Sequence, residues 1–455
     1  MTGTGTAGAY HAGVLRALHE AGVRVDLVAG RGAGAIGALF AAVDGGQRLW
    51  DKNGLWKSKS VARAYGWRLP LAIAGWALAV VAALLCVPLL LLAGGVVAAV
   101  VAVLFALVSF SSASKAVTSG YASFVDAMFA PAVLPTIIPR LVVLCLIVAA
   151  TAVIAGAILD AWRAPSRRRA ARMSVWGLLG APLSARSVMD RTAAEVWNLI
   201  RGAAAIAPPP RSDLGRRYVD LLAENLGQPG FRELLLVAHD MDARRDVVFG
   251  QLADGHRQRF FSRSVPGGRV AEAFDLAGGA HDHLMDALAA TLAVPVATEP
   301  HLLSFAAEGP WRGETHRACD RPAALARLLE EAAAAGAEQV VVLSAAPGGA
   351  RPHELQAGRT DVRGRAGEYL AASEAADLRD ALEQARASAR FAAVYVIRPA
   401  HNPIGPFDFA GVYDQRSDRR STLGELVDRG YEDAYRQFID PVVAASGERI
   451  SAVQS

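Results

Sequence analysis

Three glycines near the start of the chain have a spacing that could bind a negative charge. Gly3, Gly5 and Gly8 form the pattern G-x-G-x-x-G directly before a helix-like run. In dinucleotide-binding domains such a loop holds a pyrophosphate, but it follows a strand and precedes an acidic residue by about 20 positions. Only two residues precede these glycines, and Asp26 and Asp44 fit the acidic position loosely. The glycines alone therefore do not predict a dinucleotide site.

A second group of polar residues lies in the middle of the chain. His281, Asp282, His283 and Asp286 include an H-x4-D spacing that is similar to the motif of glycerolipid acyltransferases, although so short a pattern also arises by chance. With His301 or His316 the group contains metal-ligand residue types, but its spacing does not enforce a ligand geometry. We predict solvated histidines at helix ends, with no metal and no cofactor.

The composition excludes some classes of protein. The net charge is +4 and the isoelectric point is near 9.1, but the arginines are dispersed, so we predict no nucleic-acid partner. Cys86, Cys145 and Cys319 do not form a disulfide framework. Hydrophobic residues make up 53% of the chain. That fraction is high for a soluble protein and has a local cause.

Two long apolar runs account for the hydrophobicity. No charged residue lies between Arg68 and Lys115, and residues 141–159 form another uncharged run. A bilayer crossing needs about 20 apolar residues. The first run is long enough for two crossings with a break near Pro88 or Gly94-Gly95, and the second is long enough for one.

Basic residues flank this region on both sides. They are Lys57, Lys59, Arg63 and Arg68 before it, and Arg163, Arg167, Arg168, Arg169 and Arg172 after it. Since positive flanks mark the cytoplasmic side, we expect both flanks to be cytoplasmic, which requires an even number of crossings. Either residues 116–139, which contain Asp126, form a fourth crossing, or one apolar run is re-entrant. We favour four crossings in a multi-pass integral membrane protein.

The remaining segments alternate between helical and strand patterns. Residues 9–22 and 33–46 have helical spacing and end in glycine, and residues 23–30 between them form a short buried strand. Further on, residues 232–252 are typical of a strand, a turn and a strand, and two more buried strands follow at 337–347 and 389–400, the first behind a helix at 321–335. This alternation predicts an α/β fold with a mostly parallel sheet covered by helices on both faces.

The order of these elements resembles the patatin-like phospholipase family. The resemblance rests on the glycine loop, the helix "HAGVLRALHEAG", and a strand that leads into a G-x-nucleophile-x-G turn at Gly30–Gly34. It continues at "VAHDMDARRDVVF", which is similar to the family's "ATDLDTG" hairpin, and at "DALAATLAVPVATEPHL". It covers roughly residues 3–46 and 231–345. The family consists of lipid acyl hydrolases with a Ser/Asp dyad on an α/β sheet.

The resemblance gives the glycine loop a different role. It implies that Gly3, Gly5 and Gly8 present N–H groups to a developing oxyanion. In the family a strand precedes this loop, and Met1 and Thr2 leave no room for it. We expect either that another segment fills that position or that the natural chain begins upstream of Met1.

The resemblance also implies that both members of the dyad are substituted. The nucleophile position holds Gly32, which has no side chain to attack with. The position of the family's Asp falls in "GPWRGETHRACDRP", where we place it at Gly313 or Glu314. Glu314 preserves a carboxylate, but a base without a nucleophile does not transfer an acyl group. Beside the turn, Arg31 either holds a phosphate or carboxylate, or faces solvent or a carboxylate of the chain.

These observations lead to one functional prediction and one alternative. The chain is expected to be a membrane protein that hydrolyses phospholipid or another lipid ester, and to be inactive if Gly32 leaves it without a nucleophile. The alternative is a non-catalytic protein that binds lipid or acts as a scaffold. Membrane lipids are the expected partners; the sequence does not identify protein partners or the oligomeric state.

The predicted domain organisation is a patatin-like domain interrupted by a transmembrane insertion, with the domain on the cytoplasmic side. The segments are the first half of the domain (1–56), a transmembrane helical insertion (57–175), a helical linker (176–230), the second half (231–400) and an amphipathic C-terminal extension (401–455).

Overall fold

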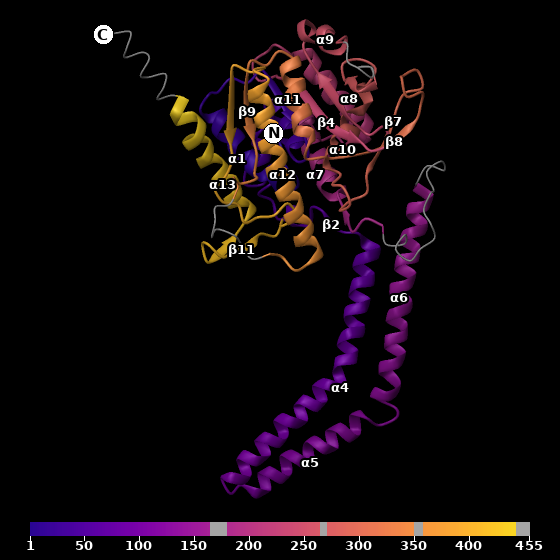
Figure 1. Ribbon diagram of the computed structural model, residues 1–455. Helices are drawn as coiled ribbons and strands as arrows, with labels where there is room; N and C mark the ends of the chain where they lie inside the picture. Colours follow the sequence, from indigo (N-terminus) through magenta and orange to yellow (C-terminus); the bar gives the residue numbers. More distant parts are fainter. Residues whose placement is uncertain (164–179, 264–270, 350–357, 443–455) are drawn as a thin grey trace, which may run out of the picture. The chain divides into compact units, whose positions relative to one another are not determined.

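A computed structural model describes residues 1–163, 180–263, 271–349 and 358–442 of the chain. The chain divides into two compact units (Figure 1). Unit 1 comprises residues 1–66 and 183–455, and unit 2 comprises residues 67–182. The two chain segments of unit 1 share one hydrophobic core, because residues from both occur in the same buried cluster.

The main sheet of unit 1 is mixed rather than mostly parallel. Its strands are β1 (Leu27–Gly30), β4 (Glu233–Asp240), β5 (Arg245–Gln251), β6 (Ala273–Asp275), β7 (His301–Ser304) and β8 (Thr315–Cys319). β1 runs parallel to β4 and β5 parallel to β6, whereas β4 is antiparallel to β5 and β8, and β7 to β8. The short connections of β4 to β5 and of β7 to β8 make hairpins, and hairpins require antiparallel strands.

The described residues of unit 1 also contain two smaller strand pairs. β9 (Gln339–Leu343) and β10 (Ala393–Ile397) are parallel, and β11 (Val412–Asp414) and β12 (Arg419–Ser421) are antiparallel. β2 (Gly66–Trp67) and β3 (Leu183–Ser184) are two-residue strands where the chain passes between the units.

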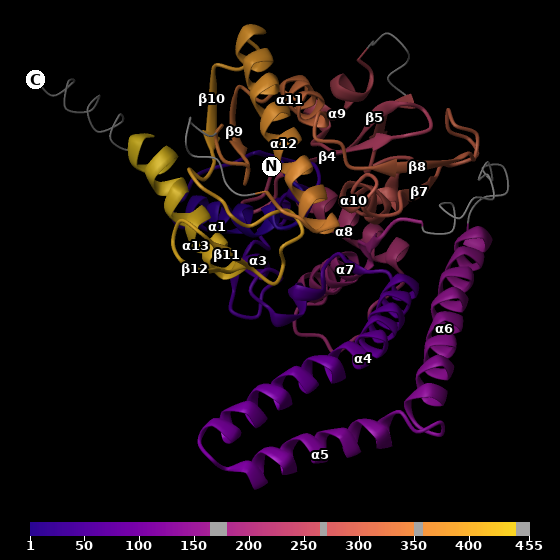
Figure 2. The ribbon, with the colours of Figure 1, turned by 60° about the horizontal axis from the view of Figure 1, so that its bottom comes forward.

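Alternate residues of β4 belong to different helical layers. Leu234, Leu236 and Ala238 lie in a core cluster with α1 (Ala7–Glu20), α2 (Gly34–Ala42) and α10 (Leu284–Leu292). Leu235 and Val237 lie in a second cluster with α11 (Ala324–Ala334) and α12 (Val362–Ala387). Helices therefore cover both faces of the sheet, as expected for strands that are apolar throughout (Figures 1 and 2).

The other helices of unit 1 pack on this framework. They are α3 (Gln47–Trp50), α7 (Arg186–Arg201), α8 (Arg211–Asn225), α9 (Asp254–Phe261) and α13 (Leu423–Ala434), which continues as a π-helical turn at Tyr435–Ile439. The predicted linker 176–230 thus contains α7 and α8, whose side chains Trp197 and Tyr218 are buried in the core. α13 begins with a capping box between Thr422 and Glu425.

α13 and α1 cross at very close range. A Cβ atom at Gly13 of α1 would overlap the backbone of Val427, and one at Gly430 of α13 would overlap the backbone of Tyr10. Tyr10 also donates a hydrogen bond of 3.0 Å to the buried Asp433. The C-terminal amphipathic helix is therefore part of the core of unit 1, where glycines allow the two backbones to approach.

The described residues of unit 2 form three helices, α4 (Leu69–Leu107), α5 (Ser111–Met128) and α6 (Leu134–Arg163). α4 runs through Pro88 and Gly94-Gly95, so the expected break into two helices does not occur; instead the helix bends in its middle (Figure 1). Tyr121 of α5 packs on Gly94 and Gly95 and donates a hydrogen bond to the carbonyl of Leu91. Tyr121 therefore forms a hydrogen bond with a backbone carbonyl of α4 close to the bend.

Two helices of the described residues are long and apolar enough to cross a membrane, α4 and residues 134–159 of α6. Most of their large apolar side chains are exposed. α5, which was expected to contribute to a fourth crossing, is not among them. Of the arginines expected on the cytoplasmic flank, Arg167, Arg168, Arg169 and Arg172 lie outside the described residues.

Candidate functional site

The glycine loop lies between the carboxyl ends of β1 and β9. The Met1 nitrogen donates to the Ala29 carbonyl over 2.8 Å, and Thr2 N donates to the Leu343 carbonyl over 3.0 Å. The chain then turns through Gly3 and Gly5, both with positive φ, before α1 begins. The first residues are therefore held by two neighbouring strands, and they place the loop above the sheet.

The strand-to-helix turn after β1 brings Gly32 to the same place. Gly32 has a φ of 55°, the left-handed conformation that side chains rarely adopt. A Cβ atom built on Gly32 would overlap the Gly3 carbonyl oxygen and lie 2.8 Å from Oδ2 of Asp320. The position predicted for a nucleophile therefore faces the glycine loop on one side and a buried carboxylate on the other.

Asp320 was not singled out in the sequence. It directly follows β8, and its N–H donates to the Ala293 carbonyl over 2.7 Å. An acidic residue immediately after a buried strand was the available signal in "THRACD". Gly313 and Glu314, the residues predicted for this role, lie in the connection between β7 and β8, where Oε2 of Glu314 is 3.3 Å from Nε2 of His316.

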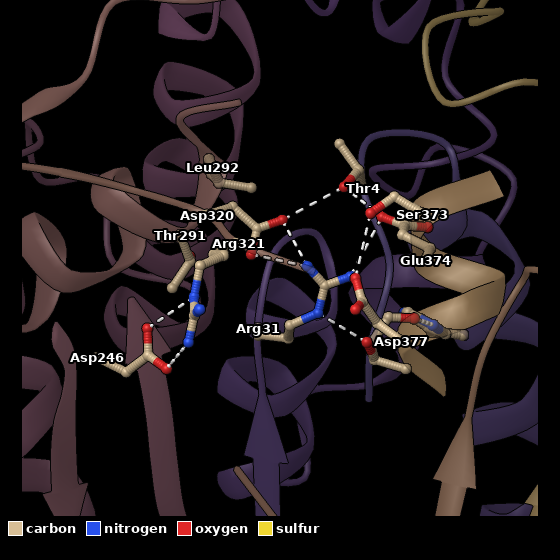
Figure 3. A network of polar contacts seen from close by, with 12 residues as sticks. Thr4, Arg31, Asp246, Thr291, Leu292, Asp320, Arg321, Ser373, Glu374 and Asp377 are labelled. Atoms are coloured by element: carbon tan, nitrogen blue, oxygen red, sulfur yellow. Dashed lines mark hydrogen bonds and ion pairs between the residues drawn. The ribbon is translucent and has the colours of Figure 1, made fainter. Parts of the chain in front are cut away.

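The guanidinium group of Arg31 lies between Asp320 and Glu374 (Figure 3). Nη1 donates to both carboxylate oxygens of Asp320, over 2.9 and 2.8 Å, and Nη2 donates to Oε1 of Glu374 on α12 over 3.2 Å. Nε donates to the Thr2 hydroxyl over 2.7 Å. The Thr4 hydroxyl donates to Glu374 and, over 3.3 Å, to Asp320. We call these five residues the Arg31 cluster.

The Arg31 cluster is almost completely buried. Arg31 and Asp320 are each 1% exposed, and Glu374 is 9% exposed. Desolvation raises the pKa of both carboxyl groups above their ordinary values, although Arg31 opposes this shift. Desolvation also acts on Arg31, but Asp320 and Glu374 outweigh it and raise the pKa of the guanidinium. One positively charged guanidinium thus faces two buried carboxyl groups. The excess of negative charge favours binding of a proton by one of these carboxyl groups.

Comparison with known proteins identifies the family of this chain. The family model described as patatin-like phospholipase matches residues 1–320, which include the glycine loop, the turn at Gly32 and Asp320. The chain belongs to the patatin-like phospholipase family. Neither a curated protein nor a solved structure matches the chain significantly. At the level of the family, the chain is thus related to lipid acyl hydrolases.

Other parts of the chain contact the glycine loop that the sequence predicts as the oxyanion site. The N–H that follows the nucleophile position, on Ala33, donates to the Gly3 carbonyl over 2.7 Å. A Cβ atom at Gly5 would overlap the Pro406 carbonyl oxygen, which accepts a hydrogen bond of 3.0 Å from Thr6 N. The segment around Pro406 therefore lies against the glycine loop.

Gly8, the third predicted oxyanion residue, lies directly against a buried side chain. A Cβ atom there would collide with the indole ring of Trp56, which is 1% exposed. Its N–H bonds back to the Gly5 carbonyl at 3.4 Å, within the first turn of the helix. Gly3 and Gly5 thus provide the positive φ angles of the loop, and Gly8 allows α1 to contact Trp56 closely.

Each histidine singled out in the middle region contacts a carboxyl group of the patatin-like domain. His281 contacts Asp220 at 2.8 Å, His301 contacts Asp286 at 2.9 Å, and Nδ1 of His316 contacts Asp240 at 2.5 Å. Desolvation raises the pKa of Asp286, but hydrogen bonds with His283 and His301 outweigh this effect and lower that pKa to about 2. Among the described residues, no group of three or more His, Cys, Asp or Glu is placed to hold a metal ion.

Proposed function

We propose that this protein is a membrane-inserted member of the patatin-like family that binds a phospholipid without hydrolysing it through a Ser/Asp dyad. The observation that carries the proposal is the Arg31 cluster. Gly32 supplies no hydroxyl, and both oxygens of Asp320 accept from Arg31. Asp320 therefore has no nucleophile to activate and is paired with a cation of the chain instead, and acyl transfer needs both groups.

A cavity next to the cluster supports binding of a lipid headgroup. It has a volume of about 410 Å³, and Thr4, Thr6 and Glu374 are among its lining residues. Arg359, which precedes α12, and Arg363 in the first turn of α12 also line it, together with the acidic residues Glu368, Asp408 and Asp414. Guanidinium groups suit phosphate, because their N–H donors match its oxygens in pairs. Arg359 pairs with Asp408 at 3.0 Å and Arg363 donates to the Phe407 carbonyl, so a phosphate would compete with these partners.

The apolar helices of unit 2 support a lipid as the ligand class. α4 and α6 expose large aliphatic side chains along their length. A helical unit of this composition gains free energy by inserting into a bilayer, since burial of apolar surface contributes roughly 25 cal/mol per Å². The basic flanks predict that the patatin-like domain lies on the cytoplasmic side.

Lipid acyl hydrolysis is the second candidate function. It is favoured by the family and by Asp320, whose carboxylate lies beside the nucleophile position as a dyad would require. Under this candidate, a hydroxyl or thiol from elsewhere would have to reach the glycine loop.

One experiment separates the two candidates. The purified full chain in nanodiscs is treated with a fluorophosphonate probe and with p-nitrophenyl butyrate, and its binding of soluble dihexanoyl phosphatidic acid is measured by calorimetry. We expect binding without probe labelling or ester turnover. Labelling of any serine, with turnover abolished by its replacement, would establish the hydrolase instead.

A matched pair of variants locates the bound lipid. Arg363→Gln removes a charge from the cavity, whereas Arg365→Gln removes an exposed charge two residues further along α12 that does not line it. We expect about tenfold weaker binding for the first variant and no change for the second, since one charge-assisted hydrogen bond contributes about 1.5 kcal/mol. Equal effects of the two variants would remove the cavity as the binding site.

A further inference from the structure

A loop of unit 1 lies beside the point where the chain passes to the apolar helices. Leu183 N donates a hydrogen bond of 2.8 Å to the Ala297 carbonyl, and Leu183 forms a parallel bridge with Thr298. We call residues 295–298 the junction loop. Leu183 belongs to β3, which pairs with β2. The junction loop is therefore attached to the pair of short strands through which the chain leaves and re-enters unit 1.

The apolar helices begin directly beyond this attachment. Pro182, the residue before Leu183, accepts a hydrogen bond of 3.0 Å from Arg68 N. Arg68 is the N-cap residue of α4, and the helix starts with the next residue, Leu69. Leu183 is thus connected to the start of α4 through one neighbouring residue and one hydrogen bond. A bilayer that α4 crosses therefore has its surface close to this attachment.

Val296 lies at the tip of the junction loop in an unfavourable conformation. Its φ is 65°, an outlier for a β-branched residue. Hydrogen bonds at the base of the loop hold it there, since Ala297 N donates to the Pro295 carbonyl over 2.7 Å and Thr298 N to the Val294 carbonyl over 2.9 Å. Its side chain is 91% exposed, the highest fraction among the large apolar side chains of the described residues. The loop therefore directs an apolar side chain outward at a conformational cost.

The residues around the attachment are basic and aromatic. Arg63, Arg68 and Arg186 lie within three residues of β2 or β3 in the sequence, and the side chain of Trp67 is 49% exposed. Glu299, directly after the junction loop, is the acidic residue nearest to Val296 in the sequence. Tryptophan and arginine are typical of the headgroup region of a membrane, where the ring lies at the interface and the cation contacts phosphate.

The size of the apolar feature distinguishes a bilayer from a protein as its partner. A stable protein interface buries on the order of 1,000 Å² or more. One valine among charged side chains does not provide such an area. A bilayer requires no matching surface, because an apolar residue enters the acyl boundary while neighbouring cations remain among the headgroups. The surroundings of the junction loop therefore fit a lipid surface.

We propose that the junction loop is a membrane-docking site of unit 1, at which Val296 enters the acyl boundary of the bilayer and Arg63, Arg68 and Arg186 contact lipid phosphates. The proposal rests on the membrane insertion of unit 2 proposed above. It adds a second attachment to the bilayer, made by a loop outside the apolar helices. Docking at this loop restricts how unit 1 turns about its connection to the helices.

A fluorescent probe at Val296 tests the docking. The full chain, with its three native cysteines replaced by alanine, receives Val296→Cys, is labelled with an NBD group and is reconstituted in nanodiscs. A phospholipid that carries a spin label near its headgroup quenches probes located at the membrane interface. We expect this lipid to remove most of the NBD emission of the Val296→Cys variant.

Two further single-cysteine variants separate docking from membrane insertion. Asp254→Cys places the probe at the start of α9, a fully exposed position at the opposite end of unit 1 from β2, and should keep its emission (Figure 1). Leu78→Cys places it on an exposed position of α4, where a spin label deep in the acyl chains should quench it. Emission retained at positions 78 and 296 would refute membrane insertion and docking together. Quenching at position 78 alone, or equal quenching at positions 254 and 296, would refute the docking only.

A second measurement leaves Val296 in place. The native chain in nanodiscs is irradiated with a phospholipid that carries a photoreactive group near its headgroup, and the crosslinked peptides are identified by mass spectrometry. We expect crosslinks to residues 295–298, and fewer of them in Val296→Ser. Crosslinks confined to α4, α5 and α6 would overturn the proposal.

Discussion

Replacing Arg31 by methionine should strongly destabilise unit 1. Methionine has a similar length but no charge, so Arg31→Met leaves Asp320 and Glu374 buried together without a cation. Arg31 donates four hydrogen bonds within the cluster, three of them to these carboxylates. Removing one partner of a buried ion pair costs about 3–5 kcal/mol. We expect a loss in the free energy of unfolding in that range.

A surface arginine provides the matched control. Arg317 makes a similar paired contact with Asp242, with distances of 2.8 and 3.1 Å, but its side chain is 47% exposed. Exposed pairs contribute about 0–1 kcal/mol, so Arg317→Met should cost no more than that. The two variants are compared by urea unfolding of the full chain in detergent, followed by tryptophan fluorescence.

The destabilisation should depend on pH with a defined sign. The pKa values of Asp320 and Glu374 are raised in the folded protein, mainly by desolvation, and loss of the guanidinium raises them further. Acids with a raised folded-state pKa stabilise the fold below their unfolded pKa, and this stability is lost as pH rises through the folded pKa. The defect of Arg31→Met should be small near pH 4, the ordinary carboxyl pKa, and should grow toward pH 7.

A second combination tests whether charge is the cause. Adding Asp320→Asn and Glu374→Gln to Arg31→Met removes both acids with little change in volume, and it should recover most of the lost stability at pH 7. A defect that is independent of pH, or that persists in the triple variant, would refute the electrostatic account. A cost equal to that of Arg317→Met would show that the cluster is not effectively buried.

Three further predictions follow from other parts of the chain. Gly32→Ser alone should lower the free energy of unfolding and remain unlabelled by a fluorophosphonate, because its Cβ would overlap the Gly3 carbonyl while Arg31 retains Asp320; rapid labelling would show that Asp320 is free to act. Gly13→Ala should destabilise unit 1 by about 1–3 kcal/mol or more in thermal melts, since its Cβ would overlap the backbone of α13, whereas the same change at Gly255 of α9, which has open space, should not meet such an overlap. Single cysteines in place of Lys59 and Arg168, in a chain without its three native cysteines, should be labelled from the same side of the membrane by an impermeant reagent, and labelling from opposite sides would contradict an even number of crossings.

Local patterns predicted the elements around the site better than the contacts within it. The glycine loop, the turn at Gly32 and the hairpin of β4 and β5 each have a signature within a short stretch of sequence. The Arg31 cluster does not, because Arg31 is 289 residues from Asp320 and 343 from Glu374. No periodicity in one segment indicates which distant acid a buried arginine will meet. Glu374 lies on α12, in the segment between the strands predicted at 337–347 and 389–400. No helix was predicted from the sequence of that segment.

The apolar helices of unit 2 show a different limit. Pro88 predicted a break because proline lacks an N–H and clashes with the preceding turn. The structure keeps one helix with a bend, and Tyr121 of α5 bonds a carbonyl close to that bend. Such compensation comes from a neighbouring helix, so the sequence of α4 alone could not reveal it. The parallel character of the sheet was likewise overestimated, because hairpin connections decide strand direction more directly than apolar composition does.

The way in which the helical insertion begins and ends bears on how such a protein could arise. Arg68 N donates a hydrogen bond of 3.0 Å to the Pro182 carbonyl, so the two ends of unit 2 are tied to each other. Closing a loop costs conformational entropy, and this cost rises only slowly with the length of the loop. Because the two ends of unit 2 are bonded to each other, inserting this segment adds little to the closure cost of the host domain. The host fold is therefore expected to tolerate this segment in the way that it tolerates a surface turn. The core of unit 1 would then need no change when the segment between Arg68 and Pro182 is lengthened or shortened.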